Sequence, residues 1–522
     1  MKSILRVGLT FGAAGLMGGN LGCSAAPTTT AVGEATQDVS STATFADPFG
    51  RVGVVSTVGI SVDTTGPFFQ NLGANGRTCN SCHKLENSLG ISVSKIQSIF
   101  NATSGLDPIF RINDGSNAPT GFYANTSTLS ARQISFSMLL NHGVIRVGEG
   151  VPANADYSLV HVNDPYGFAS AAELSLFRRP MPSVNMAFSV HVMWDGRESE
   201  GGRTAVRDAL KNQANDATQG HAQRATPLDD ATRSAIADFQ LRLFSAQQSA
   251  IVDSTHTTQL NVPGTATAEE SAAGNPANLL LALTQSTSAG GNGTFPAIGN
   301  AATNPIVVSR GVNNPFSGST LLPRCADDGL NHTGCFKNQS LTAFEPWESE
   351  ELGPSTDPVV IRRGQIGDGE NTFYNRPFNV SGVTGLNDVT GQTTVSVTCT
   401  TCHNTPQAAT NSSARFFDTG VADASGANPL FTSDFPIYTF RRIPDLIQRS
   451  VTDPGLALRT GKFADLGRFK VPSVRGLGAR APYFHNGSAK TLTDVVNFYN
   501  TRFNIGFTQT EITNLVLFLQ QT

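Results

Sequence analysis

The residues best suited to chemistry in this sequence are two groups of cysteine and histidine. The pattern Cys-x-x-Cys-His occurs twice, at Cys79, Cys82 and His83 and again at Cys399, Cys402 and His403. Two cysteines at this spacing lie one helical turn apart and can bond covalently to the two vinyl groups of a haem. The adjoining histidine then lies under the iron as its proximal ligand. The motifs therefore predict two covalently bound haem c groups, with His83 and His403 as iron ligands.

A zinc ribbon and a thioredoxin-like redox pair are the alternatives for a Cys-x-x-Cys sequence. A zinc ribbon needs its second cysteine pair about 15–20 residues after the first, whereas most of the chain separates these two pairs. Neither alternative explains a histidine directly after both pairs. With 7 cysteines and 9 histidines in 522 residues, chance predicts on the order of 10⁻³ such matches. We therefore favour haem attachment.

Two of the remaining cysteines, Cys325 and Cys335, are close in sequence. Haem attachment of this kind takes place outside the cytoplasm, where a disulfide also persists. We expect a disulfide between these two residues, with two free buried thiols as the alternative.

The N-terminus predicts export. An apolar run from Val7 to Met17 follows two basic residues and predicts a secretory signal peptide over residues 1–23, since the run is too short for a stable membrane span. Gly22-Cys23 is similar to a lipoprotein cleavage site, so a lipid anchor at Cys23 is favoured over ordinary cleavage near Ala25 or Ala26. We expect a periplasmic protein that contacts a membrane only through this N-terminal lipid.

The charge balance excludes one class of partner. The chain has 36 Lys and Arg against 40 Asp and Glu, and no basic run or aromatic-interleaved patch indicates nucleic-acid binding. The chain is longer than one hydrophobic core normally supports, so more than one domain is expected. We interpret residues 24–47 as a tether, residues 48–345 as an N-terminal haem domain with a loop insertion, and residues 346–522 as a C-terminal cytochrome c haem domain.

The elements that must position the motifs are expected to be helices, because strand signals are sparse. The predicted fold is mainly α, with two cytochrome c-like haem domains and long loop insertions. Thr226–Asp230 predicts a helix start, since proline suits the first turn and aspartate the helix dipole. The apolar face of this helix is predicted at Ile236, Phe239, Leu243 and Phe244.

Capping boxes at Thr491–Asp494 and Thr508–Glu511 predict the last two helices. The final helix carries its apolar face at Ile512, Leu515, Val516 and Leu519. The segment Asn101–Tyr166 is expected to loop over the first haem. Ser254–Gly334 is expected to be a surface excursion with one helical piece at Leu279–Leu283.

The positions of the methionines limit which residues can be the sixth iron ligand. All six, at positions 1, 17, 138, 181, 186 and 193, precede the second motif. The soft methionine ligand that raises cytochrome potentials is therefore absent near the second haem, where His485 and Tyr499 are the candidates with Tyr483 behind them. The first haem is either open or ligated by one of several histidines: His142, His161, His191 or His221. A lone histidine is more often a hydrogen-bonded structural residue than a ligand.

A further group of chemically capable residues is Met193-Trp194-Asp195-Gly196-Arg197. An indole between redox centres can relay an electron, and the arginine, Arg197, can pair bidentately with a haem propionate. The structural alternative is a core tryptophan beside an Asp-Gly turn. The residues alone favour this alternative.

The order of motifs resembles the bacterial di-haem cytochrome c peroxidase superfamily, which also contains MauG-type enzymes and haem-dependent rubber oxygenases. The resemblance covers roughly residues 70–250 and 357–522. It rests on both haem motifs and on four further stretches: Arg178–Asn185, Trp194–Arg197, Gly467–Arg475 and Ala481–Ser488.

The resemblance implies roles for several residues. Trp194 matches the tryptophan between the two haems. Tyr499 falls where peroxidases place a methionine ligand and MauG-type proteins a tyrosine, and His485 matches a histidine beside the second haem. The position of the glutamate on the distal side of the first haem falls on Gln223, with His221 two residues earlier. A glutamine cannot take a proton from peroxide, whereas a histidine can.

Three functions fit these residues, and the first is favoured. The first is reduction of hydrogen peroxide at the His83 iron, assisted by His221 or Gln223, with electrons from a small cytochrome c or copper protein through the second haem and Trp194. The second is a MauG- or rubber-oxygenase-like oxidation of a bulky organic or protein substrate. The third is a non-catalytic electron-transfer cytochrome. The resemblance also allows an interdomain calcium ion and a homodimer, although no residue pattern marks the calcium.

Overall fold

The computed structural model describes residues 43–56, 62–119, 124–186, 189, 191–198, 206–260, 316–317, 320–321, 344, 347–403 and 415–522. All described residues belong to one compact unit. The predicted signal peptide with Cys23, the Leu279–Leu283 piece and the Cys325–Cys335 disulfide lie outside the described residues. Within these residues no helix has the length and apolar character needed to cross a membrane.

The helices alternate with many short strands. The α-helices are α1 (Val93–Thr103), α2 (Leu129–Ser135), α3 (Ser137–His142), α4 (Val206–Gly220), α5 (Asp230–Leu241), α7 (Ser349–Leu352), α8 (Pro358–Asn375), α9 (Asn387–Thr390), α10 (Cys399–Cys402), α11 (Ala457–Thr460), α12 (Leu492–Phe503) and α13 (Gln509–Gln520). The strands are β1 (Ala43–Asp47), β2 (Gly50–Ser56), β3 (Ile145–Glu149), β4 (Tyr157–Asn163), β5 (Leu174–Arg178), β6 (Leu243–Ile251), β7 (Thr257–Gln259), β8 (Phe316–Ser317), β9 (Thr320–Leu321), β10 (Phe378–Ser381), β11 (Thr394–Val397), β12 (Phe416–Phe417), β13 (Ile437–Arg442), β14 (Gln448–Val451) and β15 (Phe469–Lys470).

The expectation of a mainly α fold is wrong. A four-stranded sheet runs in the order β1-β2-β6-β7, a three-stranded sheet in the order β14-β13-β4, and further strands form two-stranded pairs. The strands are short and carry Ser, Gln, Gly and Arg among their apolar residues, so they lack the clean alternation that identifies a strand in sequence. Their pairing partners lie far away in the chain, where local patterns give no information.

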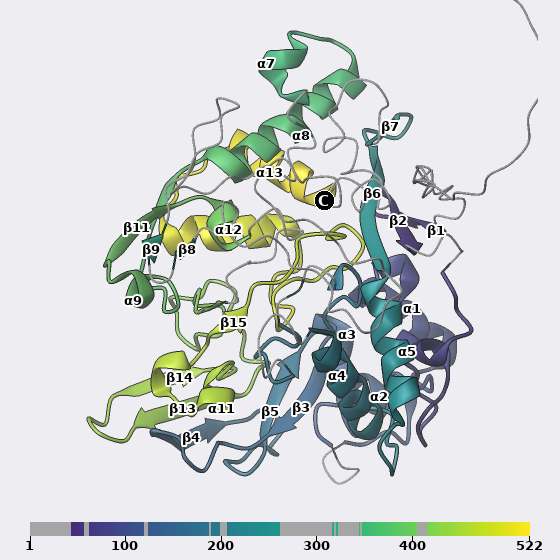
Figure 1. Cartoon of the computed structure of the whole chain (residues 1–522), viewed down its shortest axis with the longest axis vertical. Helices are drawn as coiled ribbons and strands as arrows, with labels where there is room; N and C mark the ends of the chain where they lie inside the picture. The colour runs from purple at the N-terminus through teal and green to yellow at the C-terminus, as the bar shows by residue number, and fades with distance from the viewer. Residues whose placement is uncertain are drawn as a thin grey trace, which may run out of the picture. The chain divides into compact units, whose positions relative to one another are not determined.

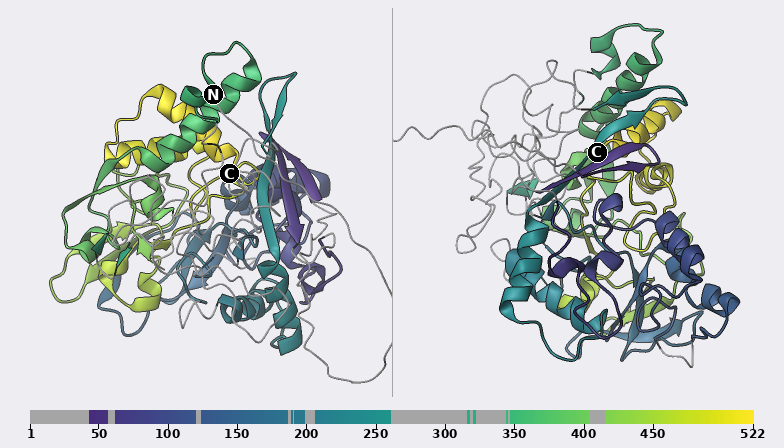
Figure 2. Two further views of the ribbon diagram at one scale, coloured as in Figure 1. Left: turned by 45° about the horizontal axis from the view of Figure 1, so that its top comes forward. Right: turned by 90° about the vertical axis from the view of Figure 1, so that its right-hand side faces the viewer.

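The sheet of β1, β2, β6 and β7 lies beside the first motif. β2 pairs antiparallel with β6 from Gly50↔Ala250 to Ser56↔Leu243, and the two views of Figure 2 show β1 and β2 (purple) alongside β6 (teal). The residues Ala43–Asp47, expected at the end of the tether, form β1. The packing of this sheet on α5 buries Val54, Ile236 and Leu243 in one apolar cluster.

The helix predicted from Thr226 is α5. Its N-cap is Asp229, whose side chain accepts a hydrogen bond from the Thr232 amide at 2.8 Å. The expected apolar face is only partly helical, because the helix ends at Leu241 and Leu243 begins β6. The segment Asn101–Tyr166, expected to be loops, contains α2, α3, β3 and β4.

The two helices predicted at the C-terminus are confirmed. The Thr491 hydroxyl accepts from the Asp494 amide at 3.1 Å, and the Asp494 carboxylate accepts from the Thr491 amide at 2.8 Å. The same reciprocal pair joins Thr508 and Glu511 at the start of α13. Figure 1 shows α12 and α13 (yellow) beside α8 (green). A Cβ at Gly369 of α8 would collide with a backbone carbonyl of α13, so this glycine permits the close approach.

A sheet joins segments from both halves of the sequence. β13 pairs antiparallel with β4 from Ile437↔Asn163 to Arg442↔Tyr157, with a register irregularity between Thr439 and Phe440. Figure 1 shows the blue β4 alongside the yellow-green β13 and β14. The predicted division into residues 48–345 and 346–522 stays a prediction.

Candidate functional site

Both Cys-x-x-Cys-His motifs adopt the same local structure. Cys79–Ser81 forms a short 3-10 helix and Cys399–Cys402 a single α-turn. In the first motif the Thr78 amide donates to the Ser81 hydroxyl at 3.0 Å; in the second the Thr398 amide donates to the Thr401 hydroxyl at 3.2 Å. The histidine amide then donates to the carbonyl of the first cysteine, at 3.0 Å in the first motif and 2.9 Å in the second. One side-chain cap therefore fixes each turn with both cysteines close to the histidine.

Each motif borders a large cavity. The first cavity, lined by Cys79, Cys82 and His83, has about 1470 Å³ of free volume, mouth included. The second, lined by Cys399, Cys402 and His403, has about 1700 Å³. Burial raises the pKa of the Cys79 and Cys399 thiols to about 12.

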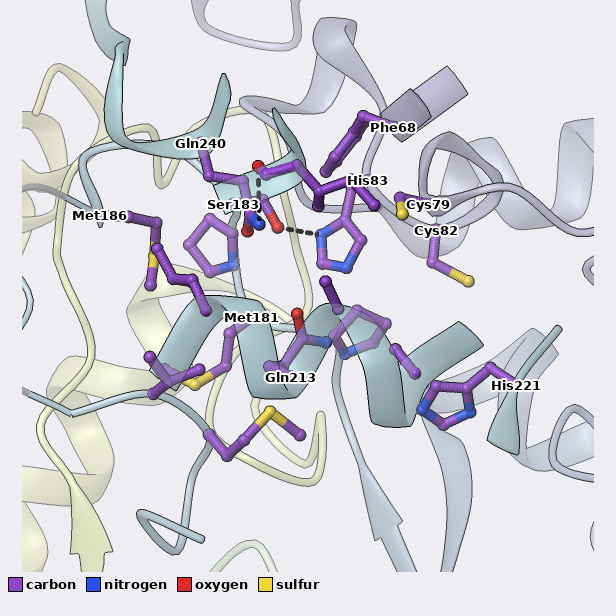
Figure 3. Close-up of a pocket in the computed structure, with 18 of the residues that line it drawn as sticks. Phe68, Cys79, Cys82, His83, Met181, Ser183, Met186, Gln213, His221 and Gln240 are labelled. Atoms are coloured by element: carbon purple, nitrogen blue, oxygen red, sulfur yellow. Dashed lines mark hydrogen bonds between the residues drawn. The ribbon is translucent and has the colours of Figure 1, made fainter. Parts of the chain in front are cut away.

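The ring of His83 is prepared to act as a ligand. Its Nδ1 lies 2.9 Å from the Leu89 carbonyl oxygen and 3.0 Å from the Ser183 hydroxyl. Because the carbonyl can only accept, Nδ1 carries the proton, and the lone pair belongs to Nε2. Figure 3 shows this second nitrogen directed into the cavity. Burial also lowers the pKa of His83 to about 4, so the imidazole is neutral, as an iron ligand must be.

The wall across the first cavity is formed by α4. The residues of α4 that line the cavity are Leu210, Gln213 and the small Ala214, Ala217 and Thr218, and Figure 3 shows Gln213 across the cavity from His83, with Met181 and Met186 alongside. Small side chains leave room for a ligand on this side. Met193 and His191 also line this cavity, whereas the candidate ligands His142 and His161 do not.

His221 follows the last turn of α4 and lies at the rim of the first cavity (Figure 3). Its Nδ1 hydrogen-bonds the buried carboxylate of Asp114, which also pairs with Arg77. Burial alone would raise the pKa of Asp114, but Arg77 and His221 together lower it. By contrast, the exposed Gln223 accepts a hydrogen bond from Asn75 at 3.3 Å and is absent from the cavity lining.

Tyr499 and His485 both line the second cavity. Tyr499 stacks on Phe503 with ring centroids 5.9 Å apart, and burial raises its pKa. His485 is 3% exposed and stacks on Phe469 at 3.9 Å. Its Nε2 is buried and makes no hydrogen bond within the described part of the chain. An orphaned buried nitrogen at the cavity wall is consistent with a bound group that this cavity accepts.

Trp194 lines both cavities, together with Arg179, Pro180, Pro182, Lys470 and Ser473. The indole is 8% exposed, donates from Nε1 to the Arg179 carbonyl at 2.9 Å, and lies edge-on to His485 at 6.3 Å. Its backbone carbonyl accepts from the Lys470 amide at 2.9 Å. The tryptophan is therefore both a core residue and the wall between the cavities.

Three cations at the cavity walls have no carboxylate partner among the residues that the structure describes. Burial lowers the pKa of Arg179 to about 9, of Arg480 to about 10 and of Lys470 to about 8. Within the described residues Arg179 and Arg480 donate to backbone carbonyls, and none of the three pairs with an acid. Buried cations are costly unless paired, so a group bearing carboxylates, such as the propionates of a haem, fits these cavities.

Arg197 also lines the first cavity, but it pairs with Glu149. The neighbouring Arg178 pairs with Asp195 and Asp453. A propionate role for Arg197 stays a prediction; among the described arginines that line the first cavity, Arg179 is the one without an acid partner. No group of three or more metal-ligating His, Cys, Asp or Glu side chains occurs among the described residues.

Sequence reasoning missed Asp114 and gave no role to Lys470. Asp114 lies within the Asn101–Tyr166 segment, and its one signal, an Asp-Gly dipeptide, normally indicates a turn. Its partners Arg77 and His221 are distant in sequence, so only the fold reveals the cluster. Lys470 lies inside the stretch Gly467–Arg475, on which the family resemblance rests, but nothing in that stretch indicates that Lys470 is buried.

Known proteins that match this chain are cytochrome c peroxidases. The chain is 32% identical to the cytochrome-c peroxidase IdrP1 of Pseudomonas sp. (strain SCT) over 123 residues, 22% of this chain and 30% of that protein. It is 35% identical to the cytochrome-c peroxidase IdrP2 of Denitromonas iodatirespirans over 105 residues, 20% of this chain and 28% of that protein. The matches thus span less than a third of each of these relatives, and support a cytochrome c peroxidase-like relationship. No family model and no solved structure matches the chain.

Proposed function

We propose that this chain is a periplasmic oxidoreductase with two covalently bound haem c groups, which reduces hydrogen peroxide at the first haem. The observation that carries the proposal is that Trp194 lines both cavities. A redox protein needs a short path between an electron store and the site of chemistry, and one shared indole supplies it. The similarity to cytochrome-c peroxidases agrees with this reaction.

Each cavity would hold its haem through residues already in place. Thioether bonds would form at Cys79 and Cys82 in the first and at Cys399 and Cys402 in the second. His83 and His403 would be the proximal ligands. Arg179 and Lys470, which line both cavities, would receive propionates. When bound, the haems supply the iron centre at which peroxide is reduced and a second centre that stores an electron.

The contribution of the protein's own residues to the reaction would be proton transfer in the first cavity. Reduction of one peroxide to two waters consumes two electrons and two protons. His221 would take the proton from the peroxide oxygen nearer the iron and return it to the oxygen that leaves as water. Gln213 would orient the peroxide by donating from its amide. Gln223 remains a weaker candidate because it is exposed and outside the cavity lining.

The electrons would enter at the second haem from a small cytochrome c or copper protein and pass through Trp194. Tyr499 and His485 would either bind the second iron or shield it from substrate. Either role suits a haem that relays electrons instead of binding substrate.

One observation favours a second candidate, the oxidation of a bulky organic substrate. Met181, Met186 and Met193 all line the first cavity. Methionine is flexible and polarizable and adapts to irregular apolar ligands, whereas peroxide alone needs no such wall. The non-catalytic electron-transfer function is the least supported, because α4 presents small residues across from His83.

The test is stopped-flow mixing of the reduced haem-loaded protein with hydrogen peroxide, followed by steady-state oxidation of a reduced small cytochrome c. Trp194→Phe should slow reoxidation of the second haem at least about tenfold, a barrier increase of about 1.4 kcal/mol, while haem content is unchanged. The matched control is Trp347→Phe, because Trp347 is the other of the chain's two tryptophans, is equally buried and lines neither cavity.

A reduced protein whose haems are not reoxidised by peroxide would refute peroxide reduction. Equal rates in the two variants would refute the tryptophan route. Consumption of an apolar organic substrate in the absence of a protein donor would establish the second candidate instead.

A further inference from the structure

The Arg77–Asp114–His221 cluster is held more firmly than a surface ion pair. Asp114 is 5% exposed. One carboxylate oxygen accepts from Arg77 and the other from His221 Nδ1. Arg77 also donates from Nε to the Pro108 carbonyl at 2.8 Å and from Nη2 to the Ile109 carbonyl at 2.7 Å. Neither the carboxylate nor the guanidinium is free to turn away.

The backbone on both sides of the cluster is also fixed. The Asp114 carbonyl accepts from the Arg146 amide of β3 at 2.7 Å. The His221 carbonyl accepts from the Asn75 side chain at 2.7 Å, and the His221 amide donates to Ala217 of α4 at 2.8 Å. The histidine is therefore held by the strand, by the helix end and by the segment before the first motif.

The imidazole itself keeps one side accessible. The side chain of His221 is 33% exposed, whereas that of Asp114 is 6% exposed. Because Nδ1 is directed at the carboxylate, the atom available to a ligand in the cavity is Nε2. A purely structural ion pair would not need the histidine, since Arg77 alone neutralises the carboxylate.

We infer that Asp114 is a positioning residue that holds His221 in one orientation and one tautomer, so that Nε2 serves as the proton acceptor of the first cavity. This inference rests on the proposed function and deepens it, because it assigns the acid–base site to a carboxylate–histidine pair in place of a single carboxylate. Asp114 does not itself touch the ligand. Arg77 fixes the carboxylate, and His83, which also lines the cavity with Cys79 and Cys82, is close enough for a charge on His221 to lower its pKa.

The test uses cyanide as the probe, because hydrogen cyanide must lose its proton before the anion binds ferric iron. In the proposed step the proton passes to His221 Nε2 and the carbon binds the iron. The binding rate of the haem-loaded full chain is followed optically from pH 5 to pH 8. His221→Gln and Asp114→Asn should each slow binding at least about tenfold, since general-base assistance contributes roughly 10²–10⁴.

The double variant decides whether Asp114 acts through the histidine. If it does, Asp114→Asn combined with His221→Gln is no slower than either single variant, because residues that act as a unit are not additive. Asp114→Glu should recover part of the rate. Additive losses, or wild-type rates in Asp114→Asn, would overturn the inference.

A matched control comes from a second Asp–His pair. His142 Nε2 lies 3.2 Å from an Asp434 oxygen, and neither residue lines either of the two cavities described above. Asp434→Asn should leave cyanide binding unchanged. If Asp114→Asn fails to fold, the Asp114→Glu and His221→Gln variants keep the question decidable through their pH profiles. A protein that binds cyanide with this dependence but does not reduce peroxide would disprove the proposed function and leave the positioning role intact.

Discussion

Replacing Arg178 with methionine should destabilise the protein strongly. The guanidinium lies 2.7 Å from an Asp195 oxygen and contacts both Asp453 oxygens at 2.7 and 2.9 Å. The side chains of the three residues are only 4%, 0% and 2% exposed. Methionine fills the aliphatic volume but leaves two buried carboxylates without their main partner. Removing one member of a buried ion pair typically costs about 3–5 kcal/mol.

The loss is not doubled, because each carboxylate keeps another donor. Asp453 still accepts from the Gly455 amide at 2.8 Å, and Asp195 still accepts from the Arg197 amide at 3.2 Å. We therefore expect about 3–5 kcal/mol for the whole change. The consequence reaches the candidate site, since Asp195 directly follows Trp194 and the same ion pairs hold that turn.

The pH dependence has a definite sign. Burial acts to raise the pKa of Asp195, but Arg178 and its neighbours lower it below its ordinary value. A carboxyl with a lowered folded pKa contributes stability above its unfolded pKa of about 3.9, and this contribution is lost as the pH falls through the folded pKa. The deficit of Arg178→Met should therefore be full at pH 7 and shrink towards pH 3.5.

The assay is urea unfolding followed by circular dichroism at both pH values. The control is Arg442→Gln, which removes an exposed ion pair with Asp445 and should change the unfolding free energy by less than about 1 kcal/mol. A deficit for Arg178→Met as small as that of the control, or one that grows on acidification, would contradict the reasoning.

The remaining predictions concern packing and the second cavity. Gly369→Ala should cost about 1–3 kcal/mol, because its Cβ would collide with the Asn514 carbonyl; Gly426→Ala, with open space around it, should be neutral in the same thermal unfolding experiment. Tyr499→Phe should change the absorption and electron paramagnetic resonance spectra of one haem, and unchanged spectra would exclude this residue as an iron ligand. Lys470→Met should lower a haem midpoint potential by about 30–60 mV, equivalent to roughly 0.7–1.4 kcal/mol, in a spectroelectrochemical titration, because a buried positive charge is removed; a rise would contradict its charge role.

Features encoded by neighbouring residues could be predicted from the sequence. The capping boxes at Thr491 and Thr508 and the N-cap before α5 depend on residues three positions apart, so the pattern is complete within one turn. The placement of His83 at a cavity could likewise be predicted, because the Cys-x-x-Cys-His motif consists of neighbouring residues. The change from helix α5 to strand β6 at Leu241–Leu243 could not be predicted, because the apolar residues there fit both the helical and the strand periodicity.

Features that depend on distant partners could not be predicted. β4 was expected to be loop, since its pairing with β13 is decided by residues in the other half of the chain. Asp114 was overlooked for the same reason, because its charge partners come from segments on either side of it. Gln223 was predicted for the distal side of the first haem because it falls at the position of the glutamate in the family that the sequence resembles. In the structure α4 continues to Gly220, and Gln213 lines the cavity instead.

The β4–β13 pairing also bears on how the chain is made. Strands drawn from both halves must meet before either the sheet or the Arg178–Asp453 contact can exist, and contacts so distant in sequence form slowly. A first half made alone would carry an uncovered strand edge that other chains could pair with. Expression of the first half alone should give an aggregation-prone product.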